Sequence, residues 1–123
     1  MKPGTRTLAV VAFVVSLSVA LPAAAHDATY SSDVTLRTDD NIIYKGRVTS
    51  SLRGCEQNRK VKLYSGTIGS GVYTGFSDRT NDEGRYRINS GPTFADYYTR
   101  AVRKVIERNG HTHECRGANS NQI

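Results

Sequence analysis

The residues best suited to hold a metal ion are two histidines and a cysteine that alternate near the C-terminus. His111, His113 and Cys115 are each separated by one residue, so in a β-strand all three side chains share one face. Imidazole and thiolate groups are common ligands of zinc and copper. A solvated loop is favoured instead, because Asn109-Gly110 is typical of a turn and Cys115 has a competing role in a disulfide. We therefore assign no metal ion and no cofactor to the chain.

A different metal site would depend on the N-terminus. Cleavage after Ala25 would make His26 the first residue. Its amine and ring nitrogen could then chelate copper together with the imidazole of His111 or His113. Amine and imidazole nitrogens suit Cu(II) in a tetragonal site. A secreted β-sandwich that binds copper or another metal is thus the alternative function that the sequence leaves open.

The first 25 residues have the pattern of a secretory signal peptide. Two basic residues precede an apolar run from Leu8 to Leu21, and Ala23-Ala24-Ala25 fits the small-x-small cleavage rule. The alternative is a retained membrane anchor, but the apolar run is shorter than the roughly 20 residues that span a bilayer. We predict a signal peptide at 1–25, one mature domain at 26–123, a secreted location and no membrane association after cleavage.

The two cysteines indicate a disulfide. A secreted chain enters an oxidising compartment, where paired cysteines become disulfides. Cys55 and Cys115 are the only cysteines, so one intramolecular bond is available to them, with free thiols or an intermolecular bridge as the alternative. The closed loop is about 60 residues long, for which the chain-entropy treatment gives roughly 4 kcal/mol of stabilisation. This is comparable to the net stability of many small domains.

Motifs that would indicate an enzyme are absent from the sequence. There is no Gly-x-Ser-x-Gly elbow, and the glycine-rich stretch from Ser65 to Gly71 lacks the Lys-Ser/Thr of a phosphate loop. Asp78, Asp82 and Glu83 are carboxylates in or beside a turn, where capping and solvation explain them. We predict that the chain is not an enzyme.

The basic balance of the chain permits an anionic partner, although charges spread along the chain with no run beyond Arg59-Lys60 favour solvated strand faces. Without Lys2 and Arg6 the chain has 15 basic and 11 acidic side chains, a net charge of +4. We expect a monomer that binds an anionic cell-envelope polymer or another secreted protein, and we expect no nucleic acid. The competing interpretation is that these charges are solvated strand faces and that the tyrosines serve packing. The possible binding surface consists of a basic strip and two tyrosines: Lys60, Lys62, Arg85, Arg87, Tyr64 and Tyr73.

Short alternating segments predict an all-β domain. Apolar and polar residues alternate at 34–37, 42–49 and 60–63, the pattern of half-buried strands. The stretch 79–88 is typical of a hairpin, because Asn, Asp and Gly in Thr80-Asn-Asp-Glu-Gly-Arg-Tyr86 supply turn chemistry. Strands that recur with turn signals every 8–12 residues are typical of a sandwich or small barrel.

The segment 95–109 fits two structures. Its apolar residues have helical spacing, and Gly110 lies where a helix C-cap would. The same segment is rich in tyrosine, threonine, valine and isoleucine, which favour strands. Its alternation requires a bulge near Ala101. We also expect a short final strand at 113–118 and a frayed polar tail at 119–123.

The order of these motifs resembles a family of small secreted bacterial domains. The segments Tyr44-Lys-Gly-Arg-Val-Thr-Ser50, Arg59-Lys-Val-Lys-Leu-Tyr64, Thr80–Tyr86, Tyr97-Tyr98 and Cys115-Arg-Gly-Ala-Asn-Ser120 carry the similarity. They are similar to transthyretin-like, carboxypeptidase-regulatory-like β-sandwiches. The resemblance implies an Ig-like or transthyretin-like sandwich of about seven strands and a strand at Tyr97-Tyr98, although a helix at 95–109 stays possible. It carries over no catalytic residues, and it implies a secreted, non-catalytic binding or structural accessory domain at the cell exterior.

Overall fold

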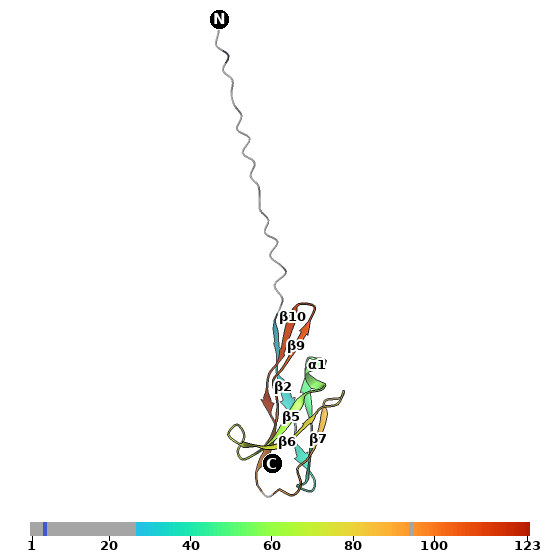
Figure 1. Ribbon diagram of the computed structural model, residues 1–123, viewed down its shortest axis with the longest axis vertical. Helices are drawn as coiled ribbons and strands as arrows, with labels where there is room; N and C mark the ends of the chain where they lie inside the picture. The colour runs from blue at the N-terminus through green and yellow to red at the C-terminus, as the bar shows by residue number, and fades with distance from the viewer. Residues whose placement is uncertain (1–3, 5–26, 94) are drawn as a thin grey trace.

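The chain folds into an all-β sandwich. The computed structural model describes residues 4, 27–93 and 95–123 (Figure 1), so the predicted signal peptide and His26 lie outside the described part apart from Gly4. The twelve described elements are eleven strands and one short helix. They are β1 (Ala28–Tyr30), β2 (Ser32–Val34), β3 (Arg37–Thr38), β4 (Ile43–Ser50), α1 (Arg53–Glu56), β5 (Lys60–Ser65), β6 (Val72–Arg79), β7 (Arg85–Asn89), β8 (Tyr97–Ala101), β9 (Lys104–Arg108), β10 (His111–Cys115) and β11 (Ala118–Asn119).

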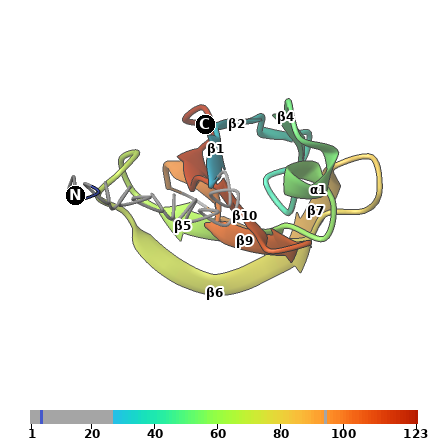
Figure 2. The same cartoon turned by 90° about the horizontal axis from the view of Figure 1, so that it is seen from above.

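Two sheets enclose the core. One has the strand order β11-β8-β5-β6, and in the other β4 pairs with β2 and β3 on one side and with β7 on the other. Seen from above, β5 and β6 lie on one side of the molecule and β2 and β4 on the other (Figure 2). The inward positions of β4, β5 and β7 are the predicted apolar ones, because alternate residues of a strand face opposite sides. The core cluster is Val34, Leu36, Tyr44, Val48, Val61, Leu63, Tyr86, Ile88 and Ala101.

The turn between β6 and β7 has the chemistry that the sequence predicts, but the predicted hairpin is wrong, because β6 pairs with β5 and β7 pairs with β4 in the other sheet. The Asn81 side-chain oxygen accepts the backbone N–H groups of Glu83 and Arg85, both at 3.0 Å. Gly84 adopts φ 77°, a left-handed conformation that glycine reaches at little cost. This turn sets the register in which Tyr86 and Ile88 point into the core while Arg85 and Arg87 stay exposed.

A third, three-stranded sheet extends one end of the molecule. β10 pairs antiparallel with β9 and parallel with β1, with Ala28 opposite His113. These strands lie at the upper end of the domain in Figure 1. The parallel pairing joins the start of the described domain to a strand near its end.

The segment 95–109 contains no helix. It forms β8 and β9, separated by Val102 and Arg103. The break is fixed by non-local hydrogen bonds, since the Val102 N–H donates to the Lys60 carbonyl oxygen at 2.9 Å. The possible helix at 95–109 is therefore wrong and the strand interpretation is correct. The alternation is imperfect because the segment forms two strands whose alternations differ in phase at this break.

The predicted frayed tail is also wrong. The side chain of Asn121 accepts the Leu36 N–H at 2.9 Å and donates to the Leu36 carbonyl oxygen at 3.0 Å. Ile123 exchanges two backbone hydrogen bonds with Tyr97. The last residues thus complete the sandwich.

Seven strands, β4 to β10, are at least five residues long, and four are shorter. Within the described residues, no helix has the length and apolar character that a membrane span would need.

Candidate functional site

A groove lined by basic side chains lies on the outer face of β3, β4 and β7. It has a volume of about 510 Å³ and is lined by five cationic side chains. Cross-strand partners share a face of a sheet, so the register arranges the cations in two rows. The first row is Arg37, Lys45 and Arg87, and the second is Arg47 and Arg85, with Thr35 at its end. We call these five side chains the basic groove.

Carboxylates neutralise the basic groove only in part. Asp39 lies 3.3 Å from Lys45 Nζ, and Glu83 lies 3.5 Å from Arg85 Nε. Both carboxylates are well exposed and come from the turns at the ends of the strands. Arg37, Arg47 and Arg87 form no ion pair within the described residues. Like charges directly opposite one another destabilise a sheet. The repulsion among these cations therefore lowers the stability of the folded domain, and the fold does not require cations at these positions.

The floor of the basic groove is held by Gly46 and Tyr86. The Tyr86 hydroxyl donates to the Thr35 carbonyl oxygen at 2.6 Å and shares a 2.8 Å hydrogen bond with Thr99. A Cβ at position 46 would overlap the Thr35 carbonyl oxygen and lie 2.5 Å from the Tyr86 hydroxyl. Burial raises the pKa of Tyr86 far above its usual value despite the bond from Thr99. The groove floor is therefore a neutral, rigid surface beneath the cations.

The six residues predicted as one binding surface lie on two different faces. Arg85 and Arg87 belong to the basic groove, but Lys60 and Lys62 project from β5 in the other sheet. The outer faces of the two sheets point away from each other, because the core lies between them. The structure therefore does not bring the four basic residues into one strip.

The two predicted tyrosines lie together with Lys62. Tyr64 of β5 pairs with Tyr73 of β6, and their ring centroids are 5.7 Å apart. Tyr64 also stacks on the buried Tyr98, at 5.3 Å between centroids. Lys62 Nζ lies 4.9 Å from the centre of the Tyr73 ring, which is a cation–π distance. These tyrosines mainly pack against one another, and Tyr73 is the exposed member, at 39% of its surface.

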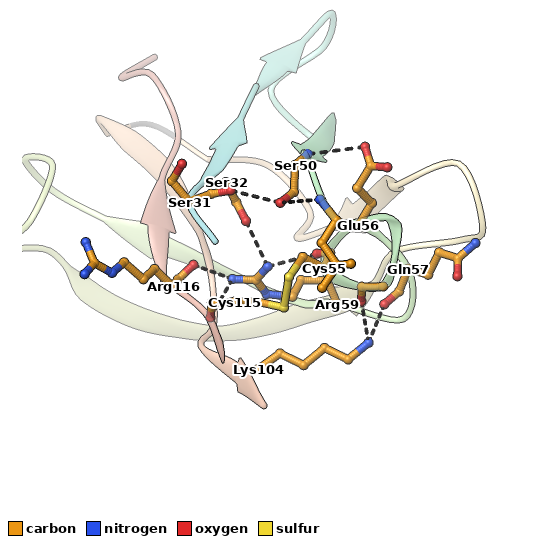
Figure 3. Close-up of a disulfide and its surroundings, with 12 residues drawn as sticks. Ser31, Ser32, Ser50, Cys55, Glu56, Gln57, Arg59, Lys104, Cys115 and Arg116 are labelled. Carbon is orange, nitrogen blue, oxygen red and sulfur yellow. Dashed lines mark hydrogen bonds between the residues drawn. A yellow bond between two sulfur atoms is a disulfide. The ribbon is translucent and has the colours of Figure 1, made fainter. Parts of the chain in front are cut away.

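The predicted disulfide is present and lies beside a buried arginine. Cys55 of α1 is bonded to Cys115 at the end of β10, with 5.5 Å between Cα atoms (Figure 3). Arg59 has no exposed surface, and burial lowers the pKa of its guanidinium. Its three nitrogens donate five hydrogen bonds of 2.5–3.4 Å to neutral acceptors. These are Ser32 Oγ and the carbonyl oxygens of Cys55, Val102, Cys115 and Arg116.

The two C-terminal histidines do not belong to a cluster of metal-ligating side chains within the described residues. His111 and His113 lie on β10, and Cys115 is in the disulfide. No group of three or more histidine, cysteine, aspartate or glutamate side chains that could hold a metal ion occurs in the described part of the chain. The ring of His113 instead lies 5.7 Å from that of Tyr30. His26, the third member of the predicted copper site, lies outside the described residues.

Three members of the basic groove were not predicted from the sequence. Lys45 and Arg47 alternate with buried residues of β4, so their outward orientation could be inferred. Their proximity to Arg85 and Arg87 depends on the pairing of β4 with β7, and Arg37 enters through the two-residue strand β3. No pattern of neighbouring residues in the sequence indicates that β4 pairs with β3 and β7.

Comparisons with known proteins provide no assignment. Neither a protein-family model nor a curated protein matches the chain. The transthyretin-like resemblance therefore stays a prediction.

Proposed function

We propose that this protein is a secreted, non-catalytic binding module that holds an anionic polymer in the basic groove. The observation that supports the proposal is the convergence of Arg37, Lys45, Arg47, Arg85 and Arg87 on one groove of about 510 Å³. Four of the five are arginines, whose planar guanidinium matches phosphate, sulfate and carboxylate groups.

The composition of the groove favours binding over catalysis. Its lining residues include no histidine or cysteine, and the carboxylates at its ends, Asp39 and Glu83, are exposed and ion-paired with Lys45 and Arg85; an unpaired group of these kinds is the usual source of a nucleophile or a general base. The groove is open to solvent on a sheet face, which the binding of an extended polymer requires. An open, basic groove is sufficient for an accessory domain that attaches to an envelope polymer.

A location outside the cell fits the disulfide and the N-terminal segment. Disulfides persist in oxidising compartments, and Cys55–Cys115 lies in the interior with both cysteines fully buried. Mass spectrometry of the protein recovered from culture medium should give a chain that begins at His26. A chain that stays in the cytoplasm with its first 25 residues would contradict this part of the proposal.

The binding proposal is tested with dextran sulfate as the polyanion. We expect binding at 50 mM salt that weakens steeply towards 200 mM, because exposed charges are screened over about 10 Å at 0.1 M ionic strength. Arg85→Glu/Arg87→Glu should lower the affinity at least tenfold.

The chain offers a matched control for this variant. Lys60→Glu/Lys62→Glu changes the net charge by the same amount on the opposite outer face. It should lower the affinity much less than the groove variant. If both double variants weaken binding equally, the net charge and not the groove attracts the polymer, and the proposal fails. Circular dichroism should show that both variants keep the wild-type fold.

A further inference from the structure

The geometry of the basic groove points to a particular class of polymer. We propose that the groove binds two successive phosphates of a linear phosphodiester polymer that carries no bases, laid along β4. This inference rests on the proposed function, and it identifies the ligand from the spacing of the cations, their chemistry and the absence of exposed aromatic rings in the groove.

The spacing of the two rows sets the repeat of the ligand. Lys45 and Arg47 are two residues apart on β4, and Arg87 and Arg85 are two apart on β7. Residues two apart in a strand are separated by about 6.7 Å. When a three-carbon unit joins two phosphates, six bonds separate the phosphorus atoms. Three backbone bonds of an extended peptide span 3.3–3.6 Å, so six comparable bonds span about 7 Å. One phosphate can thus lie over each row.

Each row supplies more than one cation to its phosphate. Lys45 lies between Arg37 and Arg87, and Arg47 lies opposite Arg85. Paired residues of neighbouring antiparallel strands have Cα atoms about 4.5–5.5 Å apart, so two side chains can reach the same phosphate. Arginine binds phosphate through two parallel N–H···O bonds. A 1,4-linked polyuronate fits less well, because rigid rings turn successive carboxylates towards different sides of the chain.

The groove gives nucleobases nothing to stack on. Binding of single-stranded nucleic acid commonly uses exposed aromatic side chains. The one aromatic residue that lines the groove is Tyr86, which is 3% exposed. Its hydroxyl is occupied by the Thr35 carbonyl oxygen at 2.6 Å. The phosphates therefore supply the interaction, and bases would add nothing to it.

Three polymers with matched numbers of anionic groups test the proposal. Binding of poly(glycerol phosphate), polygalacturonate and oligo-deoxythymidylate is measured by isothermal titration calorimetry at 100 mM salt. We expect poly(glycerol phosphate) to bind at least tenfold more tightly than polygalacturonate and at least as tightly as the oligonucleotide. Equal affinities for the phosphate and carboxylate polymers would overturn this inference but leave the proposed function standing. Tighter binding of the oligonucleotide would also overturn it. No binding to any polyanion, dextran sulfate included, would overturn both.

A small ligand tests the two-row arrangement directly. Propane-1,3-diyl bisphosphate carries two phosphates at the three-carbon spacing, and propyl phosphate carries one. The wild-type protein should bind the bisphosphate at least tenfold more tightly. Arg47→Gln/Arg85→Gln removes the cations of the second row, and should reduce the bisphosphate affinity to that of the monophosphate. Lys60→Gln/Lys62→Gln is the matched control and should keep the tenfold difference. A difference that survives in the groove variant would show that the rows do not each bind a phosphate.

Discussion

Replacement of Arg59 by methionine should cause one of the largest losses of stability available to a single substitution in this chain. Methionine keeps most of the aliphatic stem and volume but donates no hydrogen bond. The buried guanidinium satisfies five acceptors drawn from β2, α1, the segment between β8 and β9, and the end of β10. Its removal therefore affects four parts of the chain that are far apart in sequence.

The size of the loss follows from two opposing contributions. A buried acceptor without a partner costs about 1–3 kcal/mol, so five acceptors at roughly 1.5 kcal/mol each cost about 7–8 kcal/mol. Removing the guanidinium also removes the penalty for taking a cation out of water, which is several kcal/mol. With about 3 kcal/mol returned in this way, the expected net loss is about 4–5 kcal/mol. This is a large share of the 5–15 kcal/mol that stabilises a typical domain.

The assay is urea unfolding at pH 7 with the disulfide intact, monitored by circular dichroism. Arg59→Lys keeps the charge, but its ammonium has three donors for five acceptors, so its loss should lie between zero and that of Arg59→Met. Arg79→Met is the matched control, because Arg79 is exposed on β6 and makes a single 3.4 Å bond to the Asn58 carbonyl oxygen. The control should change the free energy of unfolding by less than about 0.5 kcal/mol.

Two results would refute this reasoning. A loss below about 1 kcal/mol for Arg59→Met would mean that water or the backbone replaces the lost donors. Equal stability of Arg59→Lys and the wild type would mean that charge alone, and not the five-donor geometry, is what the site requires. If Arg59→Met does not fold, the lysine variant still distinguishes these explanations.

Three further predictions concern the disulfide, the floor of the basic groove and the dependence of stability on pH. The intact protein should have a mass two hydrogen atoms below that of the reduced chain, and replacing Cys55 and Cys115 by alanine should cost roughly 4 kcal/mol in urea unfolding; alkylation of both cysteines without reduction would contradict the disulfide. Gly46→Ala should cost about 1–3 kcal/mol, because the added Cβ has to displace the Tyr86 hydroxyl or the Thr35 carbonyl; unchanged thermal unfolding would argue against that contact. Above pH 10 the unfolded chain ionises a tyrosine whose folded pKa is raised, so the folded state binds more protons and stability falls by up to about 1.4 kcal/mol per pH unit. Tyr86→Phe should show a shallower fall than the wild type, and parallel curves would contradict the assignment.

Much of the sandwich could be predicted from local pattern. The alternation of Tyr86 and Ile88 with Arg85 and Arg87 identifies both a strand and its buried face. The turn before it follows from the chemistry of asparagine and glycine. Two cysteines in a chain with a signal-like segment leave a single intramolecular pairing, and Cys55–Cys115 is the bond observed. The strand and the turn depend on neighbouring residues, and the disulfide depends on the number of cysteines, so all three can be predicted from the sequence.

The remaining features depend on contacts between distant segments. Arg59 stands beside Lys60 and appears as an ordinary exposed pair in the sequence, yet its acceptors include Ser32 and Cys115. The basic groove similarly requires Arg37 and Arg87 to flank Lys45, although they are 50 residues apart in sequence. Charge repulsion would separate such residues in an unfolded chain. Only the burial of the inner faces forces the outer cations together.

The pairing of the last residues with early strands has a consequence for the order in which the chain can fold. Asn121 holds both backbone groups of Leu36, and β10 holds β1. A chain that emerges from the ribosome or a translocation channel with its N-terminus first presents these partners after the segments that they contact. Until then Leu36 lacks its hydrogen bonds with Asn121, and Arg59 has no Cys115 or Arg116 carbonyl to bind. Folding of this domain therefore completes only after residues 111–121 have emerged, and a chaperone that escorts the nascent chain would have to remain bound until then.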